Sequence, residues 1–450
     1  MIVLYNSLNK NYHDKMKIGI IGGTSGLGET LAIILKKNDF KIAISGTNHD
    51  KGRDIALKIG VTYIEDNNDL ASSSNIVIVS VPIDRTGDVI KEVAQYMEEG
   101  SLMIDVTSIK EEPSFLMEKY LPKNVEYIPS HPIFGPRTFN LDNQVIVLTP
   151  NEKGKWYSKV LKFLKNQNMR VIETTAKKHD EMMSIVQVLT HFSYISTASA
   201  IEKLKVNIKE TENFESPIYK LMIDMIARIV SQNPYLTYFI QSKNSNGNNV
   251  RSIFAESVLE LKEVILNKEE DKFIEIANKA TKNMGDIKSA LGRSDKAIIA
   301  LNHEFKLLQK SIGNEVGLKD IYSDKTYFGI LKEVNNKDIF LDSYDDKKIY
   351  LNAYHFELLT HEELLQWKID NLDNKKHNIN CVFSNNINIE VISKTIKKIE
   401  GIISCKIKDV SNQFNIDKNQ TCLNIEIIGF NDSFIKETND LLKGFSGKII

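Results

Sequence analysis

Between residues 17 and 173, short apolar runs alternate with longer amphipathic segments. Runs this short and this rich in β-branched residues, separated by helical lengths of chain, are typical of buried strands in a mostly parallel sheet. The pattern therefore predicts a doubly wound α/β domain over residues 16–175. The expected strands are KIGII, KIAIS, NIVIVSVPI, LMIDVTS, VEYIPS, QVIVLTP and RVIETT.

From Ala176 to about Gly292 the apolar positions recur with the period of an α-helix, and turn signals are few. This pattern predicts an all-helical second domain over residues 176–295, which includes one long helix starting near His179. The helices are apolar enough to need a further covering surface. We expect that surface to be a homodimer interface, with a large core within one monomer as the alternative.

The pattern changes twice more towards the C-terminus. Residues 296–371 begin with a helix and continue with three alternating segments that predict a small antiparallel sheet. Thr360 and Glu363 then have the spacing of a capping box for a short helix. We expect a small mixed α/β module of unknown role. Residues 372–450 follow the order strand, helix, strand, strand, helix, strand, which predicts a ferredoxin-like sandwich.

Charge and cysteine content narrow the classes of function. The 450 residues include 58 basic and 59 acidic ones without a basic block, which argues against nucleic acid or an acidic membrane and favours a small-molecule substrate. The three cysteines match no disulfide framework or metal-binding spacing, so we expect a cytoplasmic protein without a metal site. Residues 1–15 lack the features of a targeting signal, and we interpret them as an N-terminal extension.

A glycine-rich turn lies where the first strand should end and a helix begin. Glycine permits the tight turn and lets the backbone approach a pyrophosphate, whose charge is met by the helix N-terminus. The segment Ile18–Gly28 has this composition, with Ser25 in place of the middle glycine of the fingerprint. We therefore expect a Rossmann-type domain that binds a nicotinamide dinucleotide. The candidate contacts in this turn are Gly23, Thr24, Ser25, Leu27 and Gly28.

The end of the second strand bears on the choice between NAD and NADP. Thr47 and Asn48 follow KIAIS, without the acidic residue that would accept hydrogen bonds from an adenosine ribose. Lys51 and Arg53 come shortly afterwards. The missing acid and the nearby cations favour NADP, with Thr47 and Asn48 as candidate contacts. A solvated face of the next helix is the alternative position for the two cations.

His131 follows the strand VEYIPS, at the sheet edge where ligands of an open α/β fold bind. Pro132 and Pro136 restrict the backbone of the expected loop. A near-neutral pKa suits a general base that takes a proton from a substrate hydroxyl, and the alternative is a surface-loop histidine. The strand LMIDVTS ends at the same edge, so Ser108 should reach the same pocket.

Two polar stripes interrupt the helical domain. They consist of Asp180, Ser184, Gln187 and His191 on one predicted helix and of Lys220, Asp224 and Arg228 on a later one. Buried polar groups need partners, so the first stripe faces either water or a polar cleft. Taken alone, the second stripe is better explained by an exposed ion pair between Asp224 and Arg228.

Taken together, these motifs resemble the prephenate dehydrogenase family. The resemblance covers about residues 16–292, and the ordered set is more specific than any single motif. The matching segments are GGTSGLG, VSVPI, DVTSIK, SHPIFGP, the His179-Asp180 pair with His191 beyond it, and SPIYKLMIDMIARIVSQNP.

The resemblance implies a role for each matching residue. In the family, the histidine matched by His131 accepts the proton of the ring hydroxyl while hydride leaves that carbon for the nicotinamide, and loss of a carboxylate as CO2 yields an aromatic ring. Ser108 matches a serine that supports this histidine and the nicotinamide. His191 matches a histidine that contacts the substrate, and Arg228 matches the arginine that binds a substrate carboxylate.

The implied reaction converts prephenate to 4-hydroxyphenylpyruvate in tyrosine biosynthesis, with NADP or NAD as oxidant. Val81 and Pro82 belong to the implied cofactor site. Some relatives use arogenate, and the residues leave both substrates open. By topology, the C-terminal unit resembles ACT-type regulatory domains, which implies an effector such as tyrosine. Other interpretations are a β-hydroxyacid dehydrogenase, an imine reductase, or a nucleotide-sensing regulatory protein without turnover. The presence of all four site residues argues against the last: His131, Ser108, His191 and Arg228.

Overall fold

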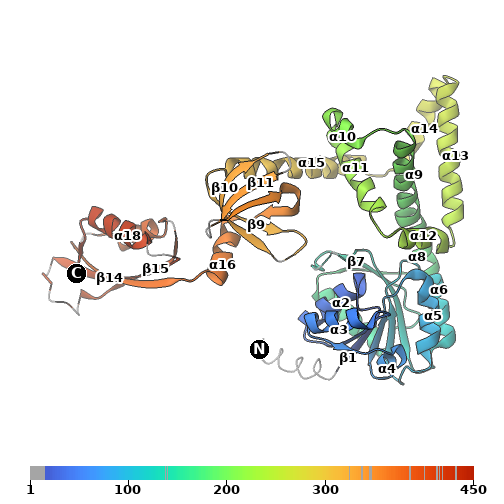
Figure 1. The fold of residues 1–450 in the computed structure, drawn as a ribbon, viewed down its shortest axis with the longest axis horizontal. Helices are drawn as coiled ribbons and strands as arrows, with labels where there is room; N and C mark the ends of the chain where they lie inside the picture. Colours follow the sequence, from blue (N-terminus) through green and yellow to red (C-terminus); the bar gives the residue numbers. More distant parts are fainter. Residues whose placement is uncertain are drawn as a thin grey trace. The chain divides into compact units, whose positions relative to one another are not determined.

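The computed structural model describes residues 16–450 except 137, 139, 324, 336–337, 344–346, 385–386, 400, 412–413, 415, 418 and 431–432. The chain forms two compact units, which divide between Ile287 and Lys288 (Figure 1). The expected extension of residues 1–15 lies outside the described residues, and the domain boundaries expected from the sequence remain predictions. In the described part of the chain, no helix is long and apolar enough to cross a membrane.

An eight-stranded sheet forms the first part of unit 1, in the order β3-β2-β1-β4-β5-β6-β7-β8. Its strands are β1 (Lys17–Ile21), β2 (Lys41–Ser45), β3 (Thr62–Tyr63), β4 (Ile76–Val79), β5 (Leu102–Asp105), β6 (Glu126–Pro132), β7 (Val145–Leu148) and β8 (Arg170–Glu173). Every strand expected from the apolar runs is present, and β3 is too short to produce such a run. The pairing of β6 with β7 is antiparallel, whereas the other neighbours are parallel.

Helices cover both faces of this Rossmann-type sheet (Figure 1). They are α2 (Gly26–Lys37), α3 (His49–Ile59), α4 (Asn67–Ser72), α5 (Ile83–Ala94), α6 (Glu111–Tyr120) and α7 (Lys155–Asn166). Because side chains alternate along a strand, Ile20 and Ile78 contribute to one apolar cluster while Ile21 and Val77 contribute to another. Burial on both faces explains why the strands are continuous apolar runs rather than alternating ones.

The remainder of unit 1 is helical. It contains α8 (Ala176–Met183), the π-helical η1 (Ser184–Leu189), α9 (Thr190–Lys203), α10 (Ile208–Thr211), η2 (Glu212–Phe214), α11 (Pro217–Val230), α12 (Pro234–Lys243), α13 (Gly247–Leu266) and α14 (Glu270–Asn283), with α15 (Ile287–Lys310) following. The chain is helical throughout the long helix predicted near His179, but the π-helical η1 interrupts the α-helical hydrogen-bond pattern between α8 and α9. Such π-helical turns occur often at functional sites.

Unit 2 contains two antiparallel sheets. The first has the order β12-β11-β10-β9-β13 and comprises β9 (Glu315–Asp320), β10 (Thr326–Val334), β11 (Asp338–Ser343), β12 (Lys348–Asn352) and β13 (Phe356–Leu358). The expected three strands correspond to β10, β11 and β12, and β9 and β13 complete the sheet. Helix α16 (His361–Asn371) follows the short η3 (Ala353–His355) and β13. It begins with the predicted capping box of Thr360 and Glu363.

The second sheet of unit 2 has the order β15-β16-β14-β17 and carries two helices. Its elements are β14 (Lys375–Ser384), α17 (Ile389–Ile396), β15 (Ile402–Asp409), β16 (Gln420–Gly429), α18 (Ser433–Gly444) and β17 (Lys448–Ile449). All of its strand pairs are antiparallel. This order confirms the predicted ferredoxin-like fold.

Candidate active site

The glycine-rich turn connects β1 to the N-terminus of α2. Gly22 has φ +82°, and a Cβ on Gly28 would lie 2.2 Å from the Gly22 carbonyl oxygen, so the close packing of helix against turn requires glycine. Ser25 is the N-cap residue of α2, but its side chain makes no capping hydrogen bond. The backbone N–H groups of the first turn are therefore left for another acceptor, which fits the pyrophosphate of a dinucleotide.

The remaining cofactor candidates lie around this turn. Leu27 is in the first turn of α2, and Val81 and Pro82 connect β4 to α5. A Cβ on Gly22 would lie 3.0 Å from Val81 Cγ1, so the two strand ends meet. Thr24 is buried below Gly46, where an added Cβ would lie 2.2 Å from the Thr24 hydroxyl oxygen.

At the end of β2, Thr47 is exposed and Asn48 caps α3 by accepting a hydrogen bond from the Lys51 backbone N–H at 3.0 Å. Arg53 is engaged by two carboxylates, Asp50 at 2.9 Å and Glu65. These contacts raise the pKa of Arg53, mainly through the hydrogen bond to Asp50. Arg53 therefore sits on a solvated face of α3, as in the alternative interpretation of the sequence.

His131 lies within β6 and not, as predicted, in a loop after the strand. The cause is the antiparallel strand β7, because its pairing of Val147 with His131 and of Ile146 with Pro132 extends β6 beyond the end of β5. The side chain of His131 is buried, with 3% of the residue exposed. His131 is therefore held by a strand, and not by a loop between two prolines.

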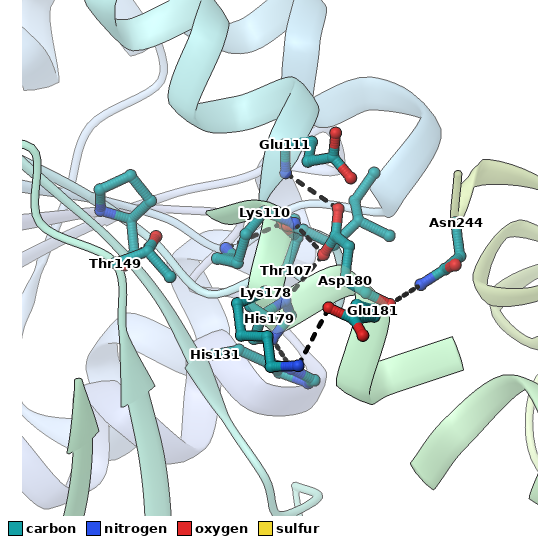
Figure 2. A network of polar contacts seen from close by, with 12 residues as sticks. Thr107, Lys110, Glu111, His131, Thr149, Lys178, His179, Asp180, Glu181 and Asn244 are labelled. Carbon is teal, nitrogen blue, oxygen red and sulfur yellow. Dashed lines mark hydrogen bonds and ion pairs between the residues drawn. The ribbon is translucent and has the colours of Figure 1, made fainter. Parts of the chain in front are cut away.

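A chain of hydrogen bonds leads from His131 into the helical part of unit 1 (Figure 2). His131 Nδ1 lies 2.9 Å from His179 Nε2, and His179 Nδ1 lies 2.7 Å from Asp180 Oδ1. The Asp180 carboxylate also accepts hydrogen bonds from the backbone N–H groups of Lys110 at 2.8 Å and Glu111 at 3.0 Å, at the start of α6. Sequence reasoning did not assign His179 to the site, although the His179-Asp180 pair was among the matching motifs.

A fully buried ion pair lies beneath these histidines. Lys110 Nζ donates to Asp105 Oδ2 at the end of β5 and to the Ser130 carbonyl oxygen at 2.6 Å. Thr107 Oγ1 donates to the same Asp105 oxygen at 2.6 Å. Burial lowers the pKa of Lys110, and the attraction of Asp105 opposes this effect. The pair joins β5 to the backbone beside His131.

The first polar stripe faces this cluster rather than water. Asp180, Ser184 and His191 are buried, and Gln187 Nε2 lies 3.4 Å from His131 Nε2. Within the described residues, Gln187 Oε1 and His191 Nδ1 are buried and have no hydrogen-bond partner. Buried polar atoms without partners are rare in native proteins, so Gln187 Oε1 beside His131, with His191 Nδ1 one helical turn further along the stripe, indicates a site for a polar ligand.

The other two sequence candidates make fewer contacts. Ser108 is half-buried in the loop between β5 and α6, and in the described structure it forms no hydrogen bond with His131. Arg228 is exposed on α11, which packs beside α9, the helix that carries His191. Asp224 and Arg228 are both exposed, as in the alternative explanation of the second stripe, but the expected ion pair between them is not among the ion pairs of the described residues. Lys220 instead pairs with Glu215 at 3.2 Å.

The environment of His131 favours its neutral form. Burial lowers its pKa well below 6.5, and the neighbouring His179 and Lys110 act in the same direction. Burial also lowers the pKa of His191. A neutral imidazole has one ring nitrogen with a free lone pair, so His131 is suited to accept a proton at neutral pH.

Comparison with known proteins agrees with this geometry. The family model "Prephenate dehydrogenase, nucleotide-binding domain" matches residues 31–173, and "Prephenate dehydrogenase, dimerization domain" matches residues 175–279. A Methanocaldococcus jannaschii protein named "Probable arogenate/prephenate dehydrogenase" is 38% identical over 441 residues, which cover 96% of this chain and 98% of the relative. The chain belongs to the prephenate dehydrogenase family. It is therefore an NAD(P)-dependent oxidoreductase.

Two further proteins match a smaller part of the chain. The T-protein of Haemophilus influenzae is 25% identical over 303 residues, which cover 67% of this chain and 75% of the relative. A crystal structure of prephenate dehydrogenase from Aquifex aeolicus, in complex with hydroxyphenyl propionate and NAD+, is 20% identical with a TM-score of 0.49. It covers 60% of this chain and 98% of its own.

Proposed function

We propose that this chain oxidises and decarboxylates prephenate to 4-hydroxyphenylpyruvate, with arogenate as the alternative substrate. The observation that carries the proposal is the buried, neutral His131 beside Gln187, whose Oε1 has no partner among the described residues, with the unpartnered His191 Nδ1 one helical turn further along the same stripe. This cluster lies where the nucleotide-binding part of unit 1 meets its helical part. A ligand held there would be enclosed by both.

The proposed chemistry assigns one proton transfer to the protein. His131 Nε2 accepts the proton of the ring hydroxyl, so that the carbon–oxygen double bond can form as hydride leaves the same carbon. The nicotinamide, when bound, supplies the hydride acceptor. Loss of the ring carboxylate as CO2 leaves its bonding electron pair in the ring, which becomes aromatic. Arg228 holds a substrate carboxylate through its guanidinium, which stays charged at any working pH.

The test is an assay of the purified protein with prephenate or arogenate, each with NADP+ or NAD+. We expect absorbance of the reduced cofactor and release of 4-hydroxyphenylpyruvate from prephenate. Turnover of arogenate alone, with tyrosine as product, would support the alternative substrate. A folded protein that binds the cofactor but turns over neither substrate would contradict the proposal.

For the cofactor we propose a preference for NADP over NAD. The support is the end of β2, where Thr47 and Asn48 stand without an acidic side chain that would repel a 2′-phosphate. Of the two cations near this position, Lys51 is exposed, whereas Arg53 is engaged by carboxylates. We therefore assign the 2′-phosphate to Lys51 rather than to Arg53.

We also propose that the chain acts in the cytoplasm as a homodimer formed through its helical part. The support for the dimer is a set of large apolar side chains that α13 exposes, because a long helix with an apolar surface needs a covering partner. These side chains are Ile253, Val258, Leu259, Ile265 and Leu266. The support for a reducing compartment is that all three cysteines are free and buried.

The ferredoxin-like part of unit 2 is proposed to bind an amino-acid effector such as tyrosine. Its strand order and two helices support this role by topology alone. Millimolar tyrosine is expected to change kcat or KM, or to raise Tm through linkage, whereas the same concentration of glycine should have no effect. If tyrosine changes none of the three quantities, the proposal is wrong.

The pH dependence follows from the lowered pKa of His131. The neutral base is the active form, and it persists above the lowered pKa, so activity falls only as pH drops through that value. We expect kcat/KM to stay level from about pH 8 to below pH 6.5, the ordinary histidine value. Circular dichroism over the same range serves as the control for unfolding. An acid limb with its midpoint at or above pH 6.5 would contradict this assignment.

Substitution of Arg228 by alanine is expected to act mainly on substrate binding. A charged hydrogen bond to a carboxylate contributes about 1.5–3 kcal/mol, so KM for prephenate should rise by about 10- to 100-fold while kcat changes little. Lys220→Met removes the same charge from the same helix and is the matched control. An unchanged KM in Arg228→Ala would remove Arg228 from the site.

A further inference from the structure

We propose that His179, held by Asp180, is a positioning residue that keeps the proton of neutral His131 on Nδ1 and thereby leaves Nε2 free as the catalytic base. This inference rests on the proposed function, because it concerns the group that takes the substrate proton. It assigns a role to two residues that the chemistry above does not use.

The proton assignment starts at Asp180. Both carboxylate oxygens accept a backbone N–H, Oδ1 from Lys110 and Oδ2 from Glu111. Both oxygens therefore act as hydrogen-bond acceptors at the N-terminus of α6. An ionised carboxylate only accepts hydrogen bonds, so the contact of 2.7 Å to His179 Nδ1 requires a hydrogen on that nitrogen.

The next step concerns His179 itself. Its side chain is fully buried between Asp180 and His131. We place a single hydrogen on this ring, on the nitrogen that faces Asp180. A neutral His179 with hydrogen on Nδ1 has its lone pair on Nε2. The contact of 2.9 Å between His179 Nε2 and His131 Nδ1 is then a hydrogen bond that His131 donates. Neutral His131 therefore has its own lone pair on Nε2.

The ring nitrogen of His131 that carries the lone pair, Nε2, faces the proposed substrate site. His131 Nε2 lies 3.4 Å from the side-chain nitrogen of Gln187, next to the unpartnered Gln187 Oε1. That nitrogen belongs to the cluster to which we assign the substrate hydroxyl. With the opposite tautomer, Nε2 would carry hydrogen and could accept no proton. The hydrogen bonds from His131 through His179 to Asp180 connect β6 with α8. The contact between the two parts of unit 1 therefore determines which nitrogen of His131 carries the hydrogen.

The first experiment compares two substitutions of His179. His179→Leu removes the acceptor for His131 Nδ1, and an orienting group of this kind in a catalytic triad is worth up to about 10⁴-fold in kcat. We expect kcat with prephenate to fall about 100- to 1,000-fold, with KM and the Kd for the cofactor within about threefold. His179→Gln retains an amide oxygen as acceptor and an N–H₂ group for Asp180, so it should recover kcat to within about tenfold of the wild type.

Lys178→Met is the matched control. Lys178 precedes His179 on α8, but its side chain pairs with Glu181 on the exposed surface at 3.0 Å. The Lys178→Met variant should therefore have unchanged kcat and KM. Equal losses of kcat in His179→Leu and His179→Gln would indicate a purely structural role and overturn the proposal. An unchanged kcat in His179→Leu would overturn it as well.

A second measurement needs no turnover. Long-range ¹H–¹⁵N correlation spectra of the full-length protein, labelled with ¹⁵N-histidine and kept at about pH 8, report which ring nitrogen carries hydrogen. The signal of His131 is identified by its loss in His131→Asn. We expect the Nδ1–H form in the wild type and in His179→Gln, and an increased Nε2–H form in His179→Leu.

The spectra separate this inference from the proposed function. An Nε2–H form of His131 in the wild type, or a doubly protonated His179, would overturn the positioning role whatever the substrate. The expected Nδ1–H form in a protein that turns over neither prephenate nor arogenate would contradict the proposed function and leave the positioning role standing. If His179→Leu does not fold, the wild-type spectrum and His179→Gln still decide the question.

Discussion

Replacement of His131 by asparagine is expected to lower kcat for prephenate by about 10²- to 10⁴-fold, the usual contribution of a general base. The asparagine Nδ2 lies close to the position of the histidine Nδ1, so the hydrogen bond to His179 can be kept. The amide has no counterpart of the basic Nε2 and cannot accept the proton. Stopped-flow or steady-state measurement of cofactor reduction gives kcat directly.

Cofactor binding separates this loss from misfolding. In the sheet, β4 and β5 separate β1, which leads into the glycine-rich turn, from β6, which carries His131, so the Kd for NADP+ in His131→Asn should stay within about threefold of the wild-type value, as measured by fluorescence titration. His361→Asn, an exposed histidine at the start of α16, is the control for the substitution itself. If His131→Asn retains kcat to within about threefold, His131 is not the base.

The strands of the Rossmann-type sheet could be predicted because burial on both faces requires continuous apolar runs. The position of His131 could not be predicted as easily. The run VEYIPS ends at Ser130, and its apolar pattern gives no sign that β7 turns back and pairs with residues 130–132. Residues 131–132 therefore form part of a strand instead of the expected loop, because they pair with β7. The same limit applies to β9 and β13, whose place in the sheet depends on partners distant in the sequence.

The site shows a similar division. The stripe from Asp180 to His191 follows helical spacing, and the structure turns it towards His131. His179 lies one position off that stripe, so helical periodicity alone assigns it to another face. Its partner His131 is 48 residues away in sequence. The buried ion pair of Lys110 and Asp105 was not predicted either, because charged side chains after a strand are usually solvated.

Removal of the Lys110 charge is expected to have the largest effect on stability. Lys110→Met leaves the Asp105 carboxylate buried without its cation, although the hydrogen bond from Thr107 remains. Breaking a buried ion pair in this way costs about 3–5 kcal/mol, much more than the loss of an exposed pair. The free energy of unfolding of unit 1 should therefore fall by about that amount.

Two tryptophans make this measurement specific. Trp156 belongs to unit 1 and Trp367 to unit 2, so a Trp367→Phe background lets fluorescence report the denaturant unfolding of unit 1 alone. Lys91→Met is the control, because the ion pair of Lys91 with Asp88 is exposed and its loss should cost less than about 1 kcal/mol.

The double variant Asp105→Asn with Lys110→Met distinguishes the cause. A neutral asparagine can still accept the hydrogen bond from Thr107, and no buried carboxylate is left without a cation. The double variant should therefore be more stable than Lys110→Met alone, even though it lacks both charges. If both variants unfold at the same denaturant concentration, the loss in Lys110→Met comes from packing or from the hydrogen bond to the Ser130 carbonyl. The stranded carboxylate would then not be the cause.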